Sequence, residues 1–278
     1  MSMGPCVRSS MHPCARIRGV AAPVTIHSKP AADIEIDAAL VGSLLLEQHP
    51  DLARLPQLAP SLPIAVPAPV RVGRPAHNYP WRWSIVPWLS GVNADLCEPR
   101  ADQAERLAAF LCTLHRPAPA NAPVNPYRGV PLRERAEQIE ERFRRLKQHT
   151  TLLDDDVARI YEAAMSVPID VESTWLHGDL HPSNLLVDGG VISGVIDWGD
   201  MTRGDRATDL ATLWMNLGDR KARENAMRSC HGVSDATWLR AKGWAVFFGV
   251  TLATSGLAGD TRHALMARRT LDRVVAGP

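Results

Sequence analysis

Three oxygen-bearing side chains, Asp179, Asn184 and Asp197, follow one another at short spacings in the second half of the chain. Carboxylate and amide oxygens are the ligands that Mg²⁺ takes, and one or two protein groups suffice when phosphates complete its shell. Transfer of a phosphoryl group to a hydroxyl also needs a carboxylate that orients the hydroxyl. The three residues could therefore support a magnesium-assisted phosphoryl transfer.

The sequence between Asn184 and Asp197 predicts the turn that brings these two residues together. Leu185–Val187 and Val191–Ile196 are β-prone runs on either side of Asp188-Gly189-Gly190. Glycines readily adopt the positive φ of a tight turn, so the pattern predicts a β-hairpin. Such a hairpin folds the chain back and sets the end of its second strand beside the loop that carries the first two side chains.

The order His-x-Asp-x-x-x-x-Asn matches the catalytic loop of kinases. Longer segments resemble the signature regions of the aminoglycoside phosphotransferase family, and together they cover roughly residues 80–275. Two motifs at the right separation are a more specific signal than either alone. The resembling segments are His177–Val187, Gly194–Asp200, Asp205–Ala211 and, for the hinge strand between lobes, Trp81–Gly91.

The resemblance implies a reaction and the residues that perform it. The chain would move the terminal phosphate of ATP or GTP to a hydroxyl of a small, aminoglycoside-like molecule, with antibiotic resistance as an associated role. Asp179 would be the catalytic base or the carboxylate that orients the hydroxyl. Asn184 and Asp197 would hold Mg²⁺.

The resemblance also implies supporting residues. Backbone around Val86, Trp88 and Leu89 would meet the adenine of the nucleotide. His177 would hold the catalytic loop in shape, and Asp209 would be structural. The implied fold is α+β and protein-kinase-like, with a reduced N-terminal lobe and a mostly helical C-terminal lobe in which the hairpin carries the metal-binding Asp.

Each of these residues has an ordinary interpretation when taken singly. Asp179 could be a turn residue, Asn184 could cap its own loop, and Asp197 could be a surface acid at a strand end. The combined spacing favours the functional interpretation. A zinc pair at His177 and His181 is weakly supported, because the proline that follows favours a loop. The tryptophans at 198 and 214 are expected in the core.

Helical periodicity dominates most of the chain, and the strands are segregated from it, which favours an α+β fold. Residues 50–80 contain many prolines and are expected to be extended and linker-like. Trp83–Leu89 is expected to be a strand. Helices are predicted over Ile34–Gln48, Ala101–His115, Leu132–Gln148, Asp154–Met165, Arg206–Leu217, Lys221–Cys230, Asp235–Leu257 and Thr261–Val275.

The part of the sequence that should grip the phosphates of a nucleotide is incomplete. Kinase-like enzymes use a glycine-rich loop and a strand lysine paired with a helix glutamate. No lysine lies between Asp33 and Gly91, and Gly73 is the only glycine from residue 43 to residue 90. We infer an internal deletion between Pro56 and Gln57. The alternative to an active enzyme is therefore an impaired or inactive kinase-fold protein. The remaining candidate cations are Arg54, Arg71, Arg74 and Arg82.

Composition limits the partners. The formal net charge of +1 gives no overall field that would steer the protein to nucleic acid or to an anionic membrane. No apolar run reaches the roughly 18 residues of a membrane span. The five cysteines form no CxxC pair, which favours reduced thiols and a cytoplasmic location.

Three regions are expected. Residues 1–32 would be a tail or a mis-assigned start, residues 33–90 a remnant of the nucleotide-binding lobe with the hinge, and residues 91–278 the catalytic lobe.

A polycationic acceptor would need an acidic pocket, although acids in the helical half are more simply surface residues. The candidate acids are Asp200, Asp205, Asp219, Glu224 and Asp260.

Overall fold

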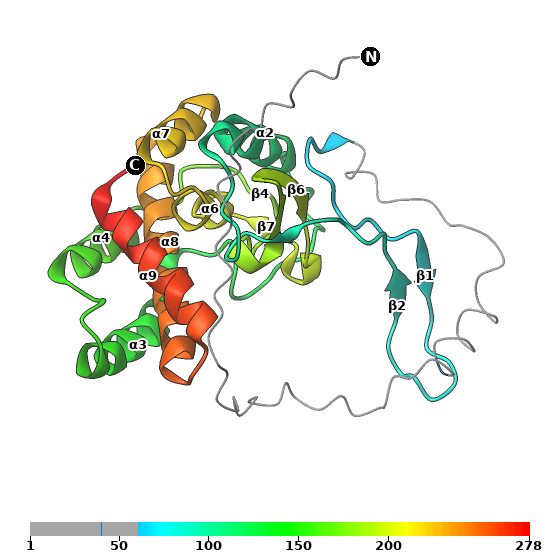
Figure 1. Ribbon diagram of the computed structural model, residues 1–278, viewed down its shortest axis with the longest axis horizontal. Coiled ribbons are helices and arrows are strands. Elements are labelled where there is room, and N and C mark those ends of the chain that lie inside the picture. Colours follow the sequence, from blue (N-terminus) through cyan, green and yellow to red (C-terminus); the bar gives the residue numbers. More distant parts are fainter. Residues whose placement is uncertain (1–39, 41–60) are drawn as a thin grey trace, which may run out of the picture.

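The computed structural model describes Leu40 and residues 61–278. The tail expected over residues 1–32 lies outside the described residues, as does the helix predicted over Ile34–Gln48 apart from Leu40, which is helical. In the described part, strands and helices are segregated as predicted: a β-hairpin lies at one end, short sheets lie in the middle, and helices fill the other side (Figure 1).

The strands form three small antiparallel sheets. The first pairs β1 with β2, the second has the order β3-β5-β6, and the third pairs β4 with β7. The β5–β6 pair is the predicted hairpin, and its turn glycines have φ values of 55° and 83°. The strands are β1 (Arg71–Gly73), β2 (Trp83–Ile85), β3 (Val92–Asn93), β4 (Thr174–Leu176), β5 (Leu185–Asp188), β6 (Val191–Val195) and β7 (Thr202–Gly204).

With one exception, the described helices match their predicted ranges to within one residue. This comparison counts the short 3-10 turns that precede α2 and α3 as part of those helices. The helix predicted over Arg206–Leu217 is divided at Ala211 into α5 and α6. The helices are α2 (Ala104–Leu114), α3 (Ala136–His149), α4 (Asp155–Ser166), α5 (Ala207–Leu210), α6 (Thr212–Asn216), α7 (Arg220–Ser229), α8 (Asp235–Leu257) and α9 (Thr261–Ala276). The 3-10 turns are η2 (Ala101–Gln103), η3 (Leu132–Arg135), η4 (Pro182–Asn184) and η5 (Trp198–Asp200).

The linker-like state expected for residues 50–80 is wrong at residues 71–73, and the strand expected over Trp83–Leu89 is too long. The region expected to be linker-like contains β1, which pairs with β2 from Arg71 opposite Ile85 to Gly73 opposite Trp83. The strand predicted over Trp83–Leu89 ends at Ile85. Pro87 lies just beyond that end and has no N–H to give to a ladder, which explains why pairing stops there.

The segment before β1 is attached to the catalytic half of the chain. Ala65 forms a parallel bridge with Gly194 of β6, and its carbonyl accepts a hydrogen bond of 2.9 Å from the N–H of Val195. The neighbouring Ile64 is 1% exposed and belongs to the main core. Residues on both sides of position 90 thus share one core, while the division into lobes stays a prediction.

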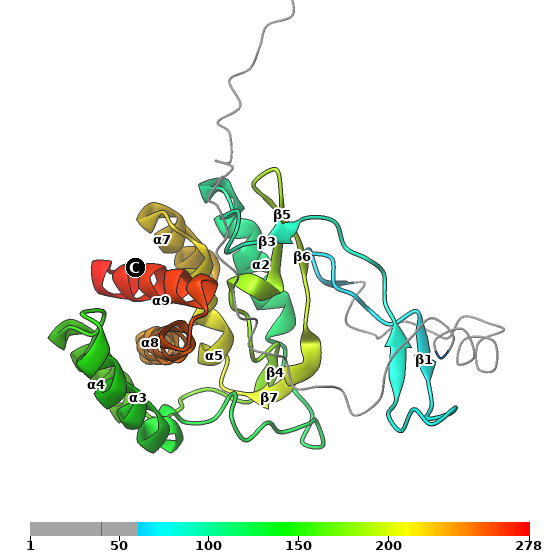
Figure 2. The same ribbon diagram turned by 60° about the horizontal axis from the view of Figure 1, so that its bottom comes forward.

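Helix α8 is the central element of the helical side, and it packs against α3, α4, α5 and α9 (Figure 2). Trp244 and Phe247 are buried within it, and residues 243–250 are buried on every side, as expected for a helix in the middle of a core. Ser234 caps its first turn by accepting from the Thr237 N–H at 3.0 Å. Within the residues that the structure describes, no helix combines the length and apolar composition that crossing a membrane requires.

A buried ion pair joins α8 to the segment after β7. Arg240 donates to Asp205 at 2.6 Å, and both side chains are 1% exposed. The same guanidinium donates to Asp170 at 2.7 Å and to the Pro168 carbonyl at 2.8 Å. Desolvation of the two charges is offset because the remaining N–H groups also have acceptors.

We expect Arg240→Met to lower the free energy of unfolding by about 3–5 kcal/mol, because it leaves the Asp205 carboxylate buried without its cation. The control is Arg220→Met, which breaks an exposed pair with Glu224 and should cost about 1 kcal/mol or less. Urea unfolding of both variants measures the difference. Equal losses would contradict the structural role given to the buried pair.

Candidate active site

The predicted catalytic loop begins where β4 ends. Antiparallel pairing with β7 fixes β4 from Thr174 to Leu176, and the loop then runs from His177 to the 3-10 turn η4. His181 begins that turn, because its Nδ1 accepts from the Ser183 N–H at 3.2 Å. Pro182 at the first position of the turn needs no hydrogen-bond acceptor. The loop is therefore held at both ends by regular structure.

The carboxylate of Asp209 fixes the start of this loop. It is fully buried and accepts from the N–H groups of His177 at 2.7 Å and Gly178 at 2.8 Å. His115, which directly follows α2, donates to the same carboxylate from Nε2 at 3.3 Å. Burial alone raises the pKa of Asp209, but His115, His177 and the Gly178 N–H together lower it below the ordinary value. The structural role expected for Asp209 is consistent with these contacts and stays a prediction.

Gly178 brings the loop against the chain that follows β6. Its φ is +87°, a conformation that glycine adopts without strain. A Cβ at this position would lie 2.6 Å from the backbone oxygen of Asp200. The loop can therefore approach the segment after Asp197 this closely only with glycine here.

His177 links the loop to the end of β6 through both ring nitrogens. Nδ1 accepts from the Asp179 N–H at 3.2 Å, so Nε2 carries the proton and donates to the Ile196 carbonyl at 2.9 Å. The ring packs edge-on against Trp198 with centroids 4.8 Å apart. The loop-holding role predicted for His177 is consistent with these contacts and stays a prediction.

A zinc pair of His177 and His181 is not favoured by this arrangement. Both nitrogens of His177 are used in hydrogen bonds, one to the Asp179 N–H in the loop and one to the Ile196 carbonyl after β6. Among residues 61–278, no three or more His, Cys, Asp or Glu side chains form a group that could hold a metal ion.

Asn184 is tied to both of the other predicted site residues. Its Nδ2 donates to the backbone carbonyl of Asp179 at 2.9 Å, and its own carbonyl accepts from the Ile196 N–H at 2.9 Å. Asp197 follows Ile196 directly in a left-handed conformation, with φ 61° and ψ 67°. Such a conformation costs a residue other than glycine free energy and is common at functional sites. The loop and the hairpin end are thus joined at Ile196.

Asp179 is partly buried and paired with a cation. Arg128 donates to its carboxylate at 2.9 Å, and His181 Nε2 lies 3.5 Å from the second oxygen. Burial raises the pKa of Asp179, but His181, Arg128 and His177 outweigh burial and lower the pKa below its ordinary value. Asp179 is therefore ionised at neutral pH.

Arg128 was not identified from the sequence. It lies 51 residues before Asp179 in a loop without periodicity, and no motif marks it. Its guanidinium also lies 3.4 Å from Asp200, to which Asn125 donates at 3.0 Å. The only available signal was an arginine near the start of a helix, which is too common to be informative.

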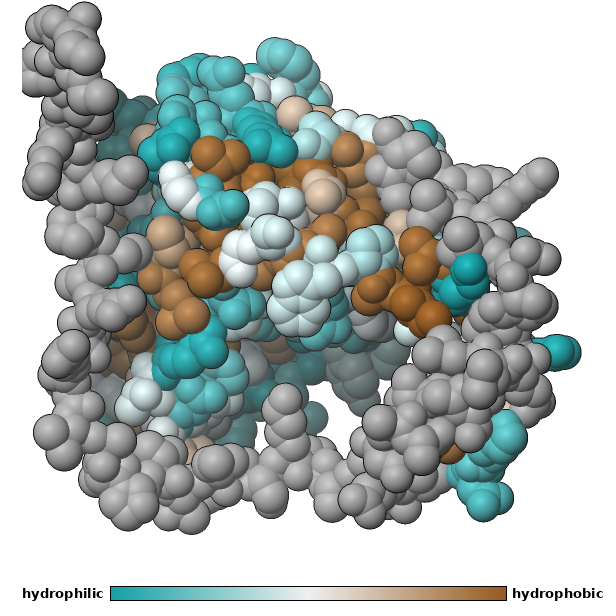
Figure 3. Space-filling model, turned by 45° about the vertical axis from the view of Figure 1, so that its right-hand side comes forward, coloured by the Kyte–Doolittle hydropathy of each residue, from teal (hydrophilic) through white to brown (hydrophobic). Residues whose placement is uncertain are grey.

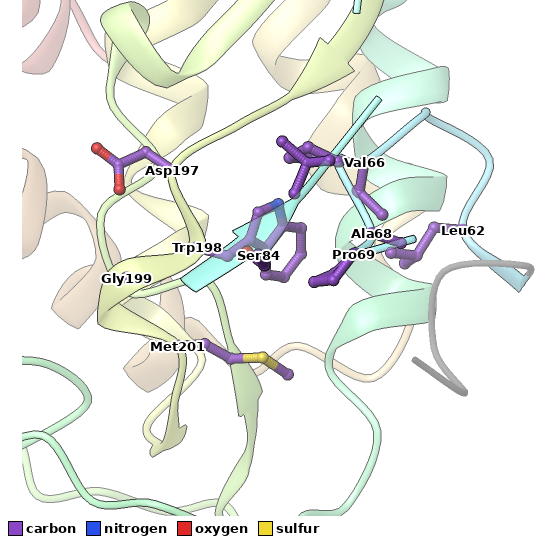
Figure 4. Close-up of a pocket in the computed structure, with 11 residues that line it drawn as sticks. Leu62, Val66, Ala68, Pro69, Ser84, Asp197, Trp198, Gly199 and Met201 are labelled. Atoms are coloured by element: carbon purple, nitrogen blue, oxygen red, sulfur yellow. The ribbon is translucent and has the colours of Figure 1, made fainter. Parts of the chain in front are cut away.

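A cavity of about 440 Å³ adjoins Asp197. Its walls are mostly apolar, and in Figure 4 the Asp197 carboxylate lies at one edge and points away from Val66 and Trp198. Figure 3, which turns the side of the β1–β2 hairpin forward, shows apolar side chains gathered on this face. The lining residues are Leu62, Val66, Pro67, Ala68, Pro69, Ser84, Val86, Asp197, Trp198, Gly199 and Met201.

The structure separates the three residues predicted to meet the adenine. Val86 lines the cavity, whereas Trp88 is 96% exposed and is not part of the lining. Leu89 lies against Gly194 of β6, outside the lining. Trp198, expected in the core, is half-buried and forms part of the wall. Trp214 is buried as expected.

Most of the candidate substrate-binding acids have structural positions. Asp205 is in the buried pair with Arg240, Asp219 and Asp260 cap α7 and α9, and Glu224 pairs with Arg220. Of the five, Asp200 alone contacts the residues around Asp179.

The pKa of Asp209 gives a pH-dependent prediction for Asp209→Asn. The variant removes the charged acceptor of the His177 and Gly178 N–H groups. A buried donor left without its acceptor lowers the free energy of unfolding by about 1–3 kcal/mol. Because the pKa of Asp209 in the folded protein lies below 3.8, the stabilisation that its ionised carboxylate provides is complete above pH 3.8. This stabilisation is lost as the pH falls through the folded-state pKa. Urea unfolding from pH 7 to pH 3 should show the wild type and the variant converging in acid.

The control for this experiment is Asp156→Asn, which removes an exposed carboxylate on α4. It should follow the wild type across the whole pH range. A gap between wild type and Asp209→Asn that stays constant down to pH 3 would contradict the role assigned to the ionised carboxylate.

Known proteins resemble this chain in sequence. It is 30% identical over 148 residues to an aminoglycoside 3'-phosphotransferase of Escherichia coli, which covers 49% of this chain and 53% of that protein. The chain thus spans about half the length of the curated relatives it matches.

Known structures resemble it in fold. The GDP complex of wild-type aminoglycoside 2'-phosphotransferase-IIIa has a TM-score of 0.51 at 17% identity, with 79% of this chain and 78% of that chain covered. The GDP and kanamycin complex of APH(2")-IIia has a TM-score of 0.50 at 19% identity, with the same coverage. These similarities confirm the kinase-like α+β fold.

A family model described as "Phosphotransferase enzyme family" matches residues 41–244. That range contains the whole catalytic loop, the β5–β6 hairpin and Asp209. The chain belongs to the phosphotransferase enzyme family.

Proposed function

We propose that this protein transfers the terminal phosphoryl group of ATP or GTP to a hydroxyl of a small molecule, with Mg²⁺. One observation carries the proposal. The Ile196 peptide is bonded on one side to Asn184 and on the other to His177. This sets Asp179, Asn184 and Asp197 on one connected framework beside a cavity.

The cavity suits the base of a nucleotide. Its volume of about 440 Å³ lies within the range of small-molecule sites, about 300–1,000 Å³. Its wall includes the Trp198 ring and short apolar residues from Val66 to Pro69. A purine ring buried there would leave its phosphates toward Asp197 at the cavity edge.

Asn184 and Asp197 fit a magnesium ion. The Nδ2 of Asn184 is used by the Asp179 carbonyl, which leaves its side-chain oxygen as the ligand atom. Asp197 is exposed and supplies a carboxylate. Two hard oxygen donors are enough, because Mg²⁺ takes its other ligands from phosphates and water. When bound, the ion would neutralise charge on the phosphates.

Asp179 would act on the acceptor. Its carboxylate is ionised and can accept a hydrogen bond from an acceptor hydroxyl, which orients the attacking oxygen. Its low pKa makes it a weak base, so the proton would reach it only as the new bond to phosphorus forms. Arg128 and His181 would hold the carboxylate in place during this step.

The relatives favour a small-molecule acceptor. The curated proteins that the chain matches over about half their length are aminoglycoside 3'-phosphotransferases. An aminoglycoside-like hydroxyl compound is therefore the first acceptor class to test.

An impaired or inactive protein is the second candidate, and one observation favours it. In residues 61–90, the described part of the small lobe, the only strand pair is the short β1–β2 hairpin. No lysine lies between Asp33 and Gly91 to hold the phosphates. Such a protein would retain the loop geometry without useful nucleotide affinity.

Thermal unfolding with Mg²⁺ and ATP or GTP separates the two candidates. At a ligand concentration of about 100 Kd, binding stabilises a protein by about 2.7 kcal/mol. We expect this stabilisation in the wild type and in Asp179→Asn, and expect it to vanish in Asp197→Ala. Asp188→Ala, which changes an exposed acid in the same hairpin, is the matched control and should behave like the wild type.

Turnover then tests the catalytic role. With aminoglycosides, macrolides and choline-like alcohols as acceptors, Asp179→Asn should lower the rate by a factor of about 10²–10⁴. A wild type that shows neither stabilisation by nucleotide nor transfer to any acceptor would support the inactive candidate instead.

A further inference from the structure

Three arginines lie in a row along the aromatic face of α8. Arg128 lies before η3, Arg135 ends η3, and Arg142 is on α3. The guanidinium carbon of Arg128 is 5.1 Å from the Phe248 ring centroid, and those of Arg135 and Arg142 are 5.5 and 5.8 Å from that of Phe247. Stacking on rings positions guanidinium groups while leaving N–H groups at their edges for other partners.

The row begins at the proposed catalytic carboxylate. Arg128 donates to Asp179 at 2.9 Å, and the other two arginines lie over Phe247, the residue next to the Phe248 ring that Arg128 contacts. In Figure 2, α3 and α8 lie across the molecule from the β1–β2 hairpin. The nucleotide cavity adjoins that hairpin through Ser84, so the arginine row borders the opposite side of the loop.

The positive charge of this row is only partly neutralised. Arg128 has Asp179 and Asp200 beside it. In the described part of the chain, no carboxylate lies within 4.0 Å of Arg135 or Arg142, which bond instead to the neutral side chains of Gln138 and Thr251.

Electrostatics and burial agree with this excess of charge. Burial first, and then the charge of Arg128, lower the pKa of Arg135. Burial, followed by the charges of Arg135 and Arg128, lowers the pKa of Arg142. Two half-buried cations that repel each other are unfavourable in the free protein. An anion between them would relieve the repulsion, whereas a polycation would increase it.

Building on the function proposed above, we propose that the acceptor is a hydroxyl compound that carries an oxyanion, either phosphate or carboxylate. Its oxyanion binds Arg135 and Arg142, and its hydroxyl lies at Asp179. The planar fork of a guanidinium matches both oxyanions with two parallel hydrogen bonds. The acceptor therefore differs in charge from the polycationic compounds named for the relatives.

Isothermal titration of the full chain without nucleotide tests the charge preference directly. The probes share one carbon skeleton: glucose 6-phosphate and gluconate are anionic, glucose is neutral, and glucosamine is cationic. Kanamycin serves as the polycation. We expect glucose 6-phosphate or gluconate to bind at least tenfold more tightly than glucose, and glucosamine and kanamycin to bind more weakly than glucose. Kanamycin binding more tightly than both anions would overturn the proposal.

Substitutions of the arginines test whether the anion binds at Arg135 and Arg142. The double variant Arg135→Gln with Arg142→Gln should weaken anion binding by about a hundredfold, since each of the two charge-assisted bonds contributes about a tenfold factor. Arg145→Gln, an exposed arginine on the same helix, should leave the affinity unchanged. Circular dichroism and melting temperature confirm that each variant is folded. Undiminished anion binding by the folded double variant would also overturn the proposal.

The two proposals fail separately. Anion binding in this titration needs no nucleotide, so a protein that lacks turnover can still show it. Turnover with kanamycin but not with an anionic acceptor would overturn the charge preference and leave the phosphotransferase function standing. Anion binding without any nucleotide-dependent transfer would count against the function and not against the oxyanion site.

Discussion

The buried carboxylate of Asp209 is the interaction on which the candidate site depends. A carboxylate taken out of water is costly unless donors replace its hydration. Here two backbone N–H groups of the catalytic loop and the ring of His115 supply them. The same bonds fix the first two residues of the loop, so the position of Asp179 follows from satisfying a buried charge. Asp209 on α5 and the loop that follows β4 thereby stabilise each other.

A second constraint is that one peptide unit after β6 forms two hydrogen bonds with the catalytic loop. The N–H and the carbonyl of residue 196 are both bonded to the catalytic loop, through the backbone of Asn184 and the ring of His177. Backbone groups at a strand end must find partners when they are buried. The pairing fixes the start of the turn that holds Asp197, and only that side chain then extends to the cavity edge. A common backbone framework keeps the proposed metal ligands, Asn184 and Asp197, in register with the proposed catalytic carboxylate of Asp179.

The two sides of the loop differ in chemistry. The side of the β1–β2 hairpin is apolar and suits a planar base, whereas the α8 side carries guanidinium groups stacked on Phe247 and Phe248. Family membership shows the phosphotransferase framework but does not determine the acceptor, because substrate recognition depends on side chains that vary around a shared fold. Arg128 connects the two parts, since it contacts the carboxylate of Asp179, which is proposed to be catalytic, and begins the arginine row.

The sequence by itself determined the local structures. Glycines at the turn predicted the β5–β6 hairpin, and helical periodicity predicted α8 from Asp235 to Leu257. These follow from interactions between residues close in sequence. Tertiary structure decided the Arg128–Asp179 contact, the pairing of β1, and the cavity wall from residues 62–69. The first and the last join segments far apart in the chain, and β1 pairs with β2 inside a proline-rich stretch without strand periodicity, so no spacing or period in the sequence revealed them.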